Sequence, residues 1–178
     1  MSTFGELPTI TTERLLLSPL RVEDAPELVA VLADERLHEF IGGRPATLEE
    51  LQDRYASLVA GSPDPEEVWL NWIARRRFDS QAIGTMQATL RGDDGHFAAQ
   101  VAWVVGVAWQ GRGFASEAAR ALVEWLRSQG AQEIVAHVHP RHRASAGVAA
   151  GAGLSPTDQE VDGEQVWRLR GAHSTKSV

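Results

Sequence analysis

One stretch decides how this chain is interpreted: Val104-Val105-Gly106-Val107-Ala108-Trp109-Gln110-Gly111-Arg112-Gly113-Phe114-Ala115-Ser116-Glu117-Ala118. An apolar run ends in a glycine turn, and apolar residues then recur at helical spacing, which predicts a strand, a tight turn and the start of a helix. Gly111 and Gly113 let the backbone approach a ligand without an intervening Cβ, and the N–H groups of the first helical turn point outward at the positive end of the helix dipole. With the Arg112 guanidinium as a further donor, the turn is suited to phosphate.

Two nucleotide-binding motifs are excluded at this turn. Ser116 stands where the dinucleotide fingerprint needs a third glycine, and no lysine follows the turn as the Walker motif requires. A glycine turn that holds no ligand is the alternative, because short glycine patterns are common.

Hydrophobic periodicity and breaker residues predict alternating strands and helices around this stretch. Strands are predicted at residues 12–19, 68–75, 82–90, 97–105, 134–139 and 165–170, with one more near Leu154. Helices are predicted over residues 20–32, 47–61, 114–130 and 144–152. Polar turn residues between the three central strands predict an antiparallel meander. The expected fold is therefore one α/β (α+β) domain over residues 1–170, followed by a disordered tail at residues 171–178.

Composition excludes several classes of protein. The chain has 178 residues and no cysteine, which excludes disulfides, thiolate metal sites and a cysteine nucleophile. A net charge of −7 argues against a general nucleic-acid binder. No apolar window reaches the ~18 to 20 residues that span a membrane, and the N-terminus lacks the pattern of a signal peptide, so no membrane partner and a cytoplasmic location are expected.

The charge is unevenly distributed along the chain. Residues 1–67 carry 14 acidic and 5 basic side chains, whereas residues 107–145 carry 3 acidic and 5 basic ones. The acidic first third is consistent with a cationic substrate, and the later segment with an anionic ligand. A solvated acidic surface is the alternative.

The stretch 110–115 resembles the Gln/Arg-x-x-Gly-x-Gly/Ala signature of the GNAT superfamily of N-acetyltransferases. Residues 100–103, 138–140 and 145–154 are similar to that family's fourth strand, fifth strand and following helix. The opening residues 12–17 resemble the branch that includes ribosomal-protein alanine N-acetyltransferases, so the likeness covers roughly residues 9–170. The resemblance implies a mixed, mainly antiparallel sheet of six to seven strands flanked by about four helices, with the fourth and fifth strands splayed apart.

The resemblance also implies a site for acetyl-CoA. The backbone of Val105 and Val107 would bind the pantetheine arm, and His142 and Ser145 occupy further cofactor positions. The pyrophosphate would be surrounded by Gln110, Gly111, Arg112, Gly113, Phe114 and Ala115. Backbone donors near the fourth strand would polarise the acetyl carbonyl.

The groups that many members of this family use for proton transfer are replaced in this sequence. Ala149 stands at the position of a tyrosine acid, Gln100 at that of a glutamate, and His142 at that of an asparagine. The remaining candidates for catalysis are His139 as a base, Glu117, or a chain of water molecules. Glu117 has an alternative role, because an acid in the first turn of a helix complements the helix dipole.

Three histidines form the pattern His137-x-His139-x-x-His142, for which metal ligation is conceivable. With no nearby carboxylate in sequence and no cysteine, we expect ordinary strand and turn histidines and no metal. Asn71 and Tyr55 are candidates for contacts to the acceptor substrate. The alternative for both is internal packing or internal hydrogen bonding.

The predicted function is N-acetyl transfer from acetyl-CoA to a primary amine, by direct attack in a ternary complex. The alternatives are transfer of another acyl group, or a non-catalytic acyl-CoA sensor or regulatory module. The acceptor is expected to be a small-molecule amine or a protein N-terminus, and the protein a monomer or homodimer.

Overall fold

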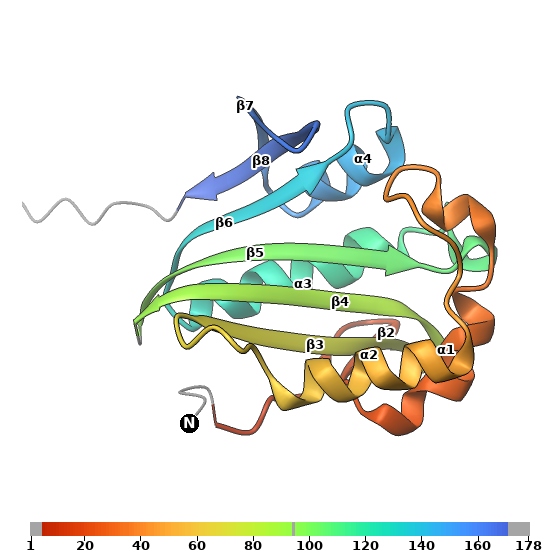
Figure 1. Ribbon diagram of the computed structural model, residues 1–178. Helices are drawn as coiled ribbons and strands as arrows, with labels where there is room; N and C mark the ends of the chain where they lie inside the picture. The colour runs from red at the N-terminus through yellow and green to blue at the C-terminus, as the bar shows by residue number, and fades with distance from the viewer. Residues whose placement is uncertain (1–4, 94, 171–178) are drawn as a thin grey trace, which may run out of the picture.

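The computed structural model describes residues 5–93 and 95–170, which form an eight-stranded sheet with the order β1-β2-β3-β4-β5-β6-β8-β7 (Figure 1). The strands are β1 Ile10–Thr11, β2 Leu15–Pro19, β3 Glu67–Arg76, β4 Ala82–Asp93, β5 His96–Val105, β6 Ala131–Val138, β7 Ser155–Val161 and β8 Glu164–Arg170. The helices are α1 Ala25–Val31, α2 Leu48–Ala60, α3 Phe114–Ser128 and α4 Arg143–Gly151, with short 3-10 turns η1 Val22–Asp24, η2 Glu35–His38 and η3 Val107–Trp109. The predicted tail at residues 171–178 lies outside the described residues.

The predicted mixed, mainly antiparallel sheet flanked by four helices is confirmed. The central meander β3–β4–β5 is antiparallel, and the one parallel pair, β5 with β6, is connected through α3. Helices α1 and α2 cover one face of the sheet and α3 covers the other (Figure 1). Each face therefore has its own apolar core, the larger one beneath α3.

The sheet has eight strands rather than six to seven, because the two-residue strand β1 precedes the first predicted strand, which is present as β2. The Thr12 hydroxyl accepts a hydrogen bond from the Leu15 N–H at 2.9 Å, and this turn separates β1 from β2. The strand near Leu154 is present as β7.

The first predicted helix, residues 20–32, is shorter in the structure. The turn η1 precedes α1, and a proline occupies the first turn of α1, where its missing N–H costs no hydrogen bond. The second predicted helix begins with the expected capping box, in which Thr47 and Glu50 cap each other's backbone N–H groups.

The fourth and fifth predicted strands, β5 and β6, pair over only part of their length. Their last register pair is Gln100 with Val135, whereas β5 continues to Val105 and β6 to Val138. Beyond that pair the two strands diverge (Figure 1). The expected splay is confirmed, and it opens a gap beside the glycine turn.

Candidate active site

The glycine turn, residues 106–113, connects β5 to α3 and contains two glycines with positive φ. Gly111 has a φ of +72° and Gly113 a φ of +79°, in the left-handed region that other residues rarely adopt. A Cβ built on Gly111 would meet no protein atom within 4 Å. The turn therefore faces open space in which a ligand group has room.

The start of α3 supplies hydrogen-bond donors to this space. The first hydrogen bond of the helix runs from the Glu117 N–H to the Gly113 carbonyl at 3.0 Å. The N–H groups of Phe114, Ala115 and Ser116 precede that ladder, so helix geometry leaves them without a partner inside the helix. Together with the dipole of α3, they favour an anion at this end.

The predicted cofactor residue Gln110 is turned back onto the chain itself. Its side-chain amide donates to the Val105 carbonyl at 2.9 Å, and its backbone N–H donates to the Val107 carbonyl at 3.2 Å. A pantetheine amide that used the Val105 oxygen would have to displace this side chain.

Arginines surround the glycine turn but differ in their partners. Arg14 is bound to Glu117, and Arg76 is paired with Asp79. The Arg112 guanidinium lies over the Trp109 ring, 5.3 Å from its centroid, and Arg76 lies over the same ring at 4.3 Å. Arg112 thus rests on an aromatic face instead of a carboxylate, which leaves its N–H donors available for an anionic ligand.

Glu117 ties the start of α3 to the turn between β1 and β2. Its carboxylate accepts hydrogen bonds from the Thr12 hydroxyl at 2.6 Å, the Arg14 N–H at 2.8 Å and Arg14 Nε at 2.6 Å. Burial by itself would raise the pKa of Glu117, but these hydrogen bonds hold it below its ordinary value. These contacts favour a structural role for Glu117 over the catalytic role predicted from sequence.

The open end of the β5–β6 gap is bordered by a contact that the sequence did not predict. Trp103 of β5 donates from Nε1 to the hydroxyl of Ser145 in α4 at 3.2 Å. This bond links β5 to α4 beyond the point where β5 and β6 stop pairing. Ser145, a predicted cofactor residue, therefore lies at the edge of the gap.

The histidine corner, formed by Phe40, His139 and His142, lies where β6 turns into α4. The ring of Phe40 stacks on His142 with a centroid separation of 4.3 Å and an interplanar angle of 12°, and it lies 5.2 Å from His139 at 45°. Burial, and next the charge of His139, lower the pKa of His142, while Glu39 opposes this. Phe40 belongs to the irregular segment between α1 and α2, which has no periodicity that would have identified it.

The third histidine does not join this corner in a metal site. His137 Nδ1 lies 3.5 Å from the Gln100 side-chain amide, across the β5–β6 pair. Within residues 5–93 and 95–170, no group of three or more histidine, aspartate or glutamate side chains is arranged to hold a metal ion.

The two predicted substrate residues are both buried, Tyr55 on α2 and Asn71 on β3. Tyr55 is 3% exposed and Asn71 is 9% exposed. Tyr55 packs with Leu51 and Ile73 in the smaller core, and burial raises its pKa to about 12. In the part of the chain that the structure describes, its hydroxyl has no hydrogen-bond partner. This placement favours the packing alternative for Tyr55.

Part of the acidic first third is engaged in ion pairs. Arg75 bridges Asp24 at 2.8 Å and Glu27 at 2.7 Å. Other pairs of the same kind join Arg36 to Asp34, Arg44 to Glu50, and Arg91 to Asp64 and Glu67. Among the described residues these pairs include six of the 14 carboxylates of residues 1–67, so most of the acidic surplus is unpaired, and a cationic acceptor stays a prediction.

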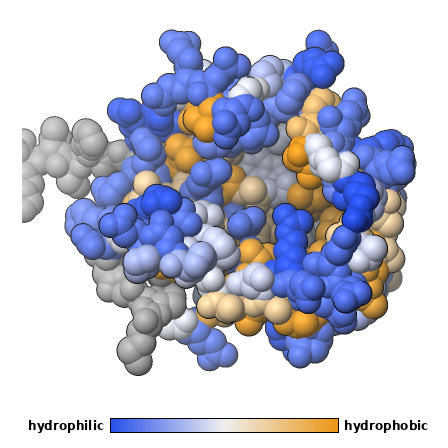
Figure 2. All heavy atoms as spheres, in the orientation of Figure 1, coloured by the Kyte–Doolittle hydropathy of each residue, from blue (hydrophilic) through white to orange (hydrophobic). Residues whose placement is uncertain are grey.

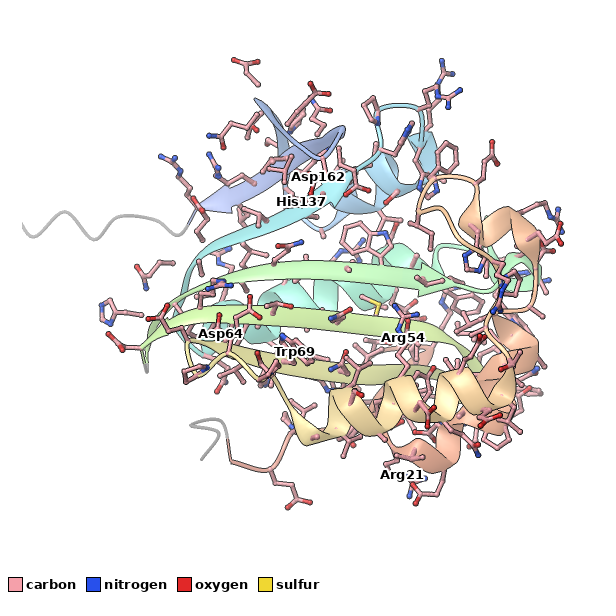
Figure 3. All side chains as sticks on the ribbon, in the orientation of Figure 1. Arg21, Arg54, Asp64, Trp69, His137 and Asp162 are labelled. Carbon is pink, nitrogen blue, oxygen red and sulfur yellow. The ribbon has the colours of Figure 1, made fainter. Side chains whose placement is uncertain are left out.

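The face that carries α1 and α2 is hollowed above α2 (Figure 2). Arg54 reaches from α2 toward β4, and His137 projects from β6 on the other side of the hollow (Figure 3). This hollow, next to the β5–β6 gap, is the candidate acceptor site.

Comparison with known proteins agrees with this geometry. The family model for the acetyltransferase (GNAT) domain matches residues 14–155. None of the curated proteins matches the chain. No helix in the described part of the chain is both long and apolar enough to cross a membrane.

Solved acetyltransferases share the fold. An acetyltransferase from Agrobacterium tumefaciens has a TM-score of 0.69 and 25% identity, and the match covers 96% of this chain and 99% of that one. The aminoglycoside acetyltransferase AAC(6')-Ib, in complex with coenzyme A, has a TM-score of 0.70 and 20% identity over 88% of this chain and 94% of its own. RimL, the ribosomal L7/L12 alpha-N-protein acetyltransferase in complex with coenzyme A, has a TM-score of 0.70 and 13% identity over 92% of this chain and 98% of its own.

Proposed function

This chain belongs to the GNAT family of acetyl-CoA-dependent acetyltransferases, and we propose that it transfers the acetyl group to a primary amine by direct attack in a ternary complex. The observation that carries the proposal is the early end of the β5–β6 pairing, directly beside a glycine turn that faces open space. With no cysteine in the chain, no acyl-cysteine forms.

The residues present fit acetyl-CoA. The N–H groups at the start of α3 and the donors of Arg112 suit the pyrophosphate, and Gly111 leaves room for it. The pantetheine arm would enter the β5–β6 gap, along the backbone at Val105 and Val107, with Ser145 and His142 at its edge. Binding in this direction would carry the thioester away from the glycine turn, toward the point where β5 and β6 pair at Gln100 and Val135.

The acceptor amine would approach from the hollow above α2. Its two candidate classes, a small-molecule amine and a protein N-terminus, match the acceptors named for AAC(6')-Ib and RimL. The reaction needs a free amine, so the amine must lose its proton before attack. The cytoplasmic location, the single domain over residues 1–170 and the monomeric or dimeric state remain predictions.

A non-catalytic acyl-CoA sensor is the second candidate. The two positions at which the family usually has proton-transfer groups hold Ala149, which is fully buried, and Gln100, which lies beside His137. Neither of those groups is therefore present at these positions. Transfer of a larger acyl group, such as propionyl or succinyl, is the third candidate function.

The decisive experiment combines binding with turnover. Acetyl-CoA is titrated into the protein by calorimetry, and release of free thiol is then followed with an aminoglycoside, a polyamine, an amino acid and a peptide with a free N-terminus. Binding together with amine-dependent thiol release is expected. Binding without turnover on any acyl-CoA would favour the sensor, faster turnover with propionyl-CoA or succinyl-CoA would favour the other transferase, and no binding would reject all three.

A further inference from the structure

A row of three side chains crosses the sheet on the face that α1 and α2 cover. Asn71 of β3 pairs with Gln87 of β4, and Gln87 pairs with Ala102 of β5. Residues that pair directly share a face of the sheet, and the two neighbours of Asn71 on β3, Leu70 and Trp72, lie in the larger core beneath α3. The row therefore faces away from α3, on the side of the candidate acceptor site.

The length of the pantetheine arm places the thioester at one end of this row. An extended arm spans about 16 Å from its phosphate to its sulfur, which equals about five residues of a strand at about 3.3 Å per residue. The arm is expected along the backbone from Val107 toward Gln100, so about five residues of strand bring the sulfur to Ala102. Ala102 lies beyond the last β5–β6 pair, Gln100 with Val135, where the gap is open. An amine that attacks from the side of α2 would therefore stand over Ala102, with Gln87 beside it.

The two amides of the row have no internal partner. Asn71 is 9% exposed, and within residues 5–93 and 95–170 neither its side-chain amide nor that of Gln87 makes a hydrogen bond. A buried amide without a partner costs stability, and this calls for an explanation such as a ligand that binds it. An amide both donates and accepts hydrogen bonds, which suits the carboxylate or amide groups of an acceptor.

Arg54 adds a positive charge that is not paired. Its side chain is exposed and extends from α2 toward β4, the strand of Gln87 (Figure 3). Among the described residues it makes no ion pair. Of the positions three and four residues away on the helix only Glu50 is acidic, and Arg44 binds that carboxylate at 2.6 Å. A guanidinium stays charged in proteins, so Arg54 offers a permanent cation to the acceptor.

The acids of the central strands are not free to bind a cation. Glu67 of β3 is bound to Arg91, and Glu133 of β6 is bound to Arg168 at 3.2 Å. Apart from Asp93, at the end of β4 away from the glycine turn, these are the only acidic side chains of β3 to β6. The local charges therefore favour an anionic group on the acceptor, in contrast to the cationic acceptor predicted from the composition of residues 1–67.

We propose that the acceptor is an amine that carries a carboxylate, as in an acidic amino acid or a peptide with an acidic first residue, and that it lies with its amine over Ala102 and its carboxylate on Arg54. The proposal rests on acetyl transfer as the function. Gln87 and Asn71 bind the polar groups between these two ends. Adjacent strands lie about 4.8 Å apart, which is close to the distance from the amine to the side-chain carboxylate of aspartate.

Aspartate and asparagine are the matched acceptors for the test, because they differ in one charged group. For the wild type, kcat/KM should be about tenfold higher for aspartate than for asparagine, and likewise for a peptide that begins with Asp over one that begins with Asn. Arg54→Gln should remove this preference, mainly through KM, because a contact to the unreacting end of a substrate contributes to binding. Arg127→Gln, at the exposed far end of α3, is the control and should keep the preference.

Three results would overturn the proposal: equal kcat/KM for aspartate and asparagine and for the two peptides, a preference that survives in Arg54→Gln, or faster turnover of a polyamine than of every acidic acceptor. A preference that is seen only with the amino acids, or only with the peptides, would support the proposal and identify the source of the carboxylate. Raised salt should reduce the preference of the wild type, since charges are screened.

Asn71→Leu tests the amides separately from the charge. No internal hydrogen bond is lost, so the variant should melt no lower than the wild type, whereas KM for aspartate should rise about fivefold. A lower melting temperature with unchanged KM would show that Asn71 acts within the fold, and would overturn its part in the site.

Binding of aspartate to the CoA complex, measured by calorimetry, separates this proposal from the proposed function. Aspartate should bind the wild-type complex about tenfold more tightly than the Arg54→Gln complex, whether or not thiol is released. Absence of thiol release with every amine would reject acetyl transfer. Equal binding of aspartate by the two complexes would overturn the carboxylate site.

Discussion

The glycine turn and the histidine corner border the same gap but are built in opposite ways. The turn is a contiguous segment whose shape is set by two residues with positive φ and by the first N–H groups of α3. The corner unites Phe40, from the segment between α1 and α2, with two histidines at the β6–α4 connection. A local backbone conformation can thus be predicted from a short motif, whereas a cluster of side chains from distant segments cannot.

We therefore expect damage to the glycine turn to affect cofactor binding. The largest effect is expected for Gly111→Val. Gly163, in the turn between β7 and β8, offers a matched control, because it has a similar φ of +79° and equally open space around its Cα.

Both valine variants should lose about 1 to 2 kcal/mol of stability from the left-handed backbone. Only Gly111→Val should weaken CoA binding, by about a hundredfold, because its side chain fills the space that a phosphate would use. Calorimetry with CoA and a melting curve for each protein measure the two effects. Similar affinities in the two variants would remove the turn from the cofactor site.

An intermediate effect is expected for Arg112→Gln. Loss of a charge-assisted contact to phosphate should weaken CoA binding about tenfold at low salt, and less at high salt, where charges are screened. S-acetyl-pantetheine, which lacks the phosphates, should bind both proteins equally.

Arg127→Gln, at the exposed far end of α3, is the control for Arg112→Gln and should not change either affinity. An equal loss of affinity for S-acetyl-pantetheine would show that Arg112 acts through the fold and not on phosphate.

The smallest effect on catalysis is expected for Glu117→Gln, which tests whether the turn needs its anchor to the β1–β2 connection. The folded-state pKa of Glu117 lies below its ordinary value of 4.5, so its stabilisation is present above about that pH and is lost as pH falls through the folded-state value. At pH 7 the variant should melt about 5 °C lower, since hydrogen bonds to a charged group are weakened. The difference in melting temperature between Glu117→Gln and the wild type should decrease toward pH 3.

Glu124→Gln, on the exposed surface of the same helix, provides the control and should melt like the wild type at every pH. The pH dependence of kcat/KM in Glu117→Gln should match that of the wild type. Loss of a titrating limb with unchanged stability would return Glu117 to the list of catalytic residues.

Sequence periodicity predicted most of the fold, because the pattern that indicates each helix or strand lies within that segment. The capping box at Thr47 and Glu50 and the apolar face of α3 are patterns within one segment, and both are present as predicted. The strand β1 was not predicted, because its two residues are too few for a periodic pattern and it is defined by its pairing with β2. The sheet also has one strand more than expected for this reason.

Some features of the candidate site could be predicted from the sequence, and others could not. The positive φ of Gly111 and Gly113 follows from the residue type, since glycine alone adopts positive φ without strain. Tyr55 could also be singled out in the sequence, as its only tyrosine, but its burial depends on how α2 packs in the folded protein. The acidic excess of residues 1–67 was a fact of composition, whereas the pairing of Asp24 and Glu27 with Arg75 depended on which segments became neighbours.

By itself, the sequence determined the strand–turn–helix unit at 104–118, the order of the elements and the family to which they point, because backbone preference and hydrophobic period act over short distances. Only the tertiary structure decided which side chains meet: Glu117 with Thr12 and Arg14, Trp103 with Ser145, and Phe40 with His142. Each of these pairs joins segments far apart in the chain. Their contact depends on the splay of β5 and β6 and on the packing of both faces of the sheet, which no local pattern encodes.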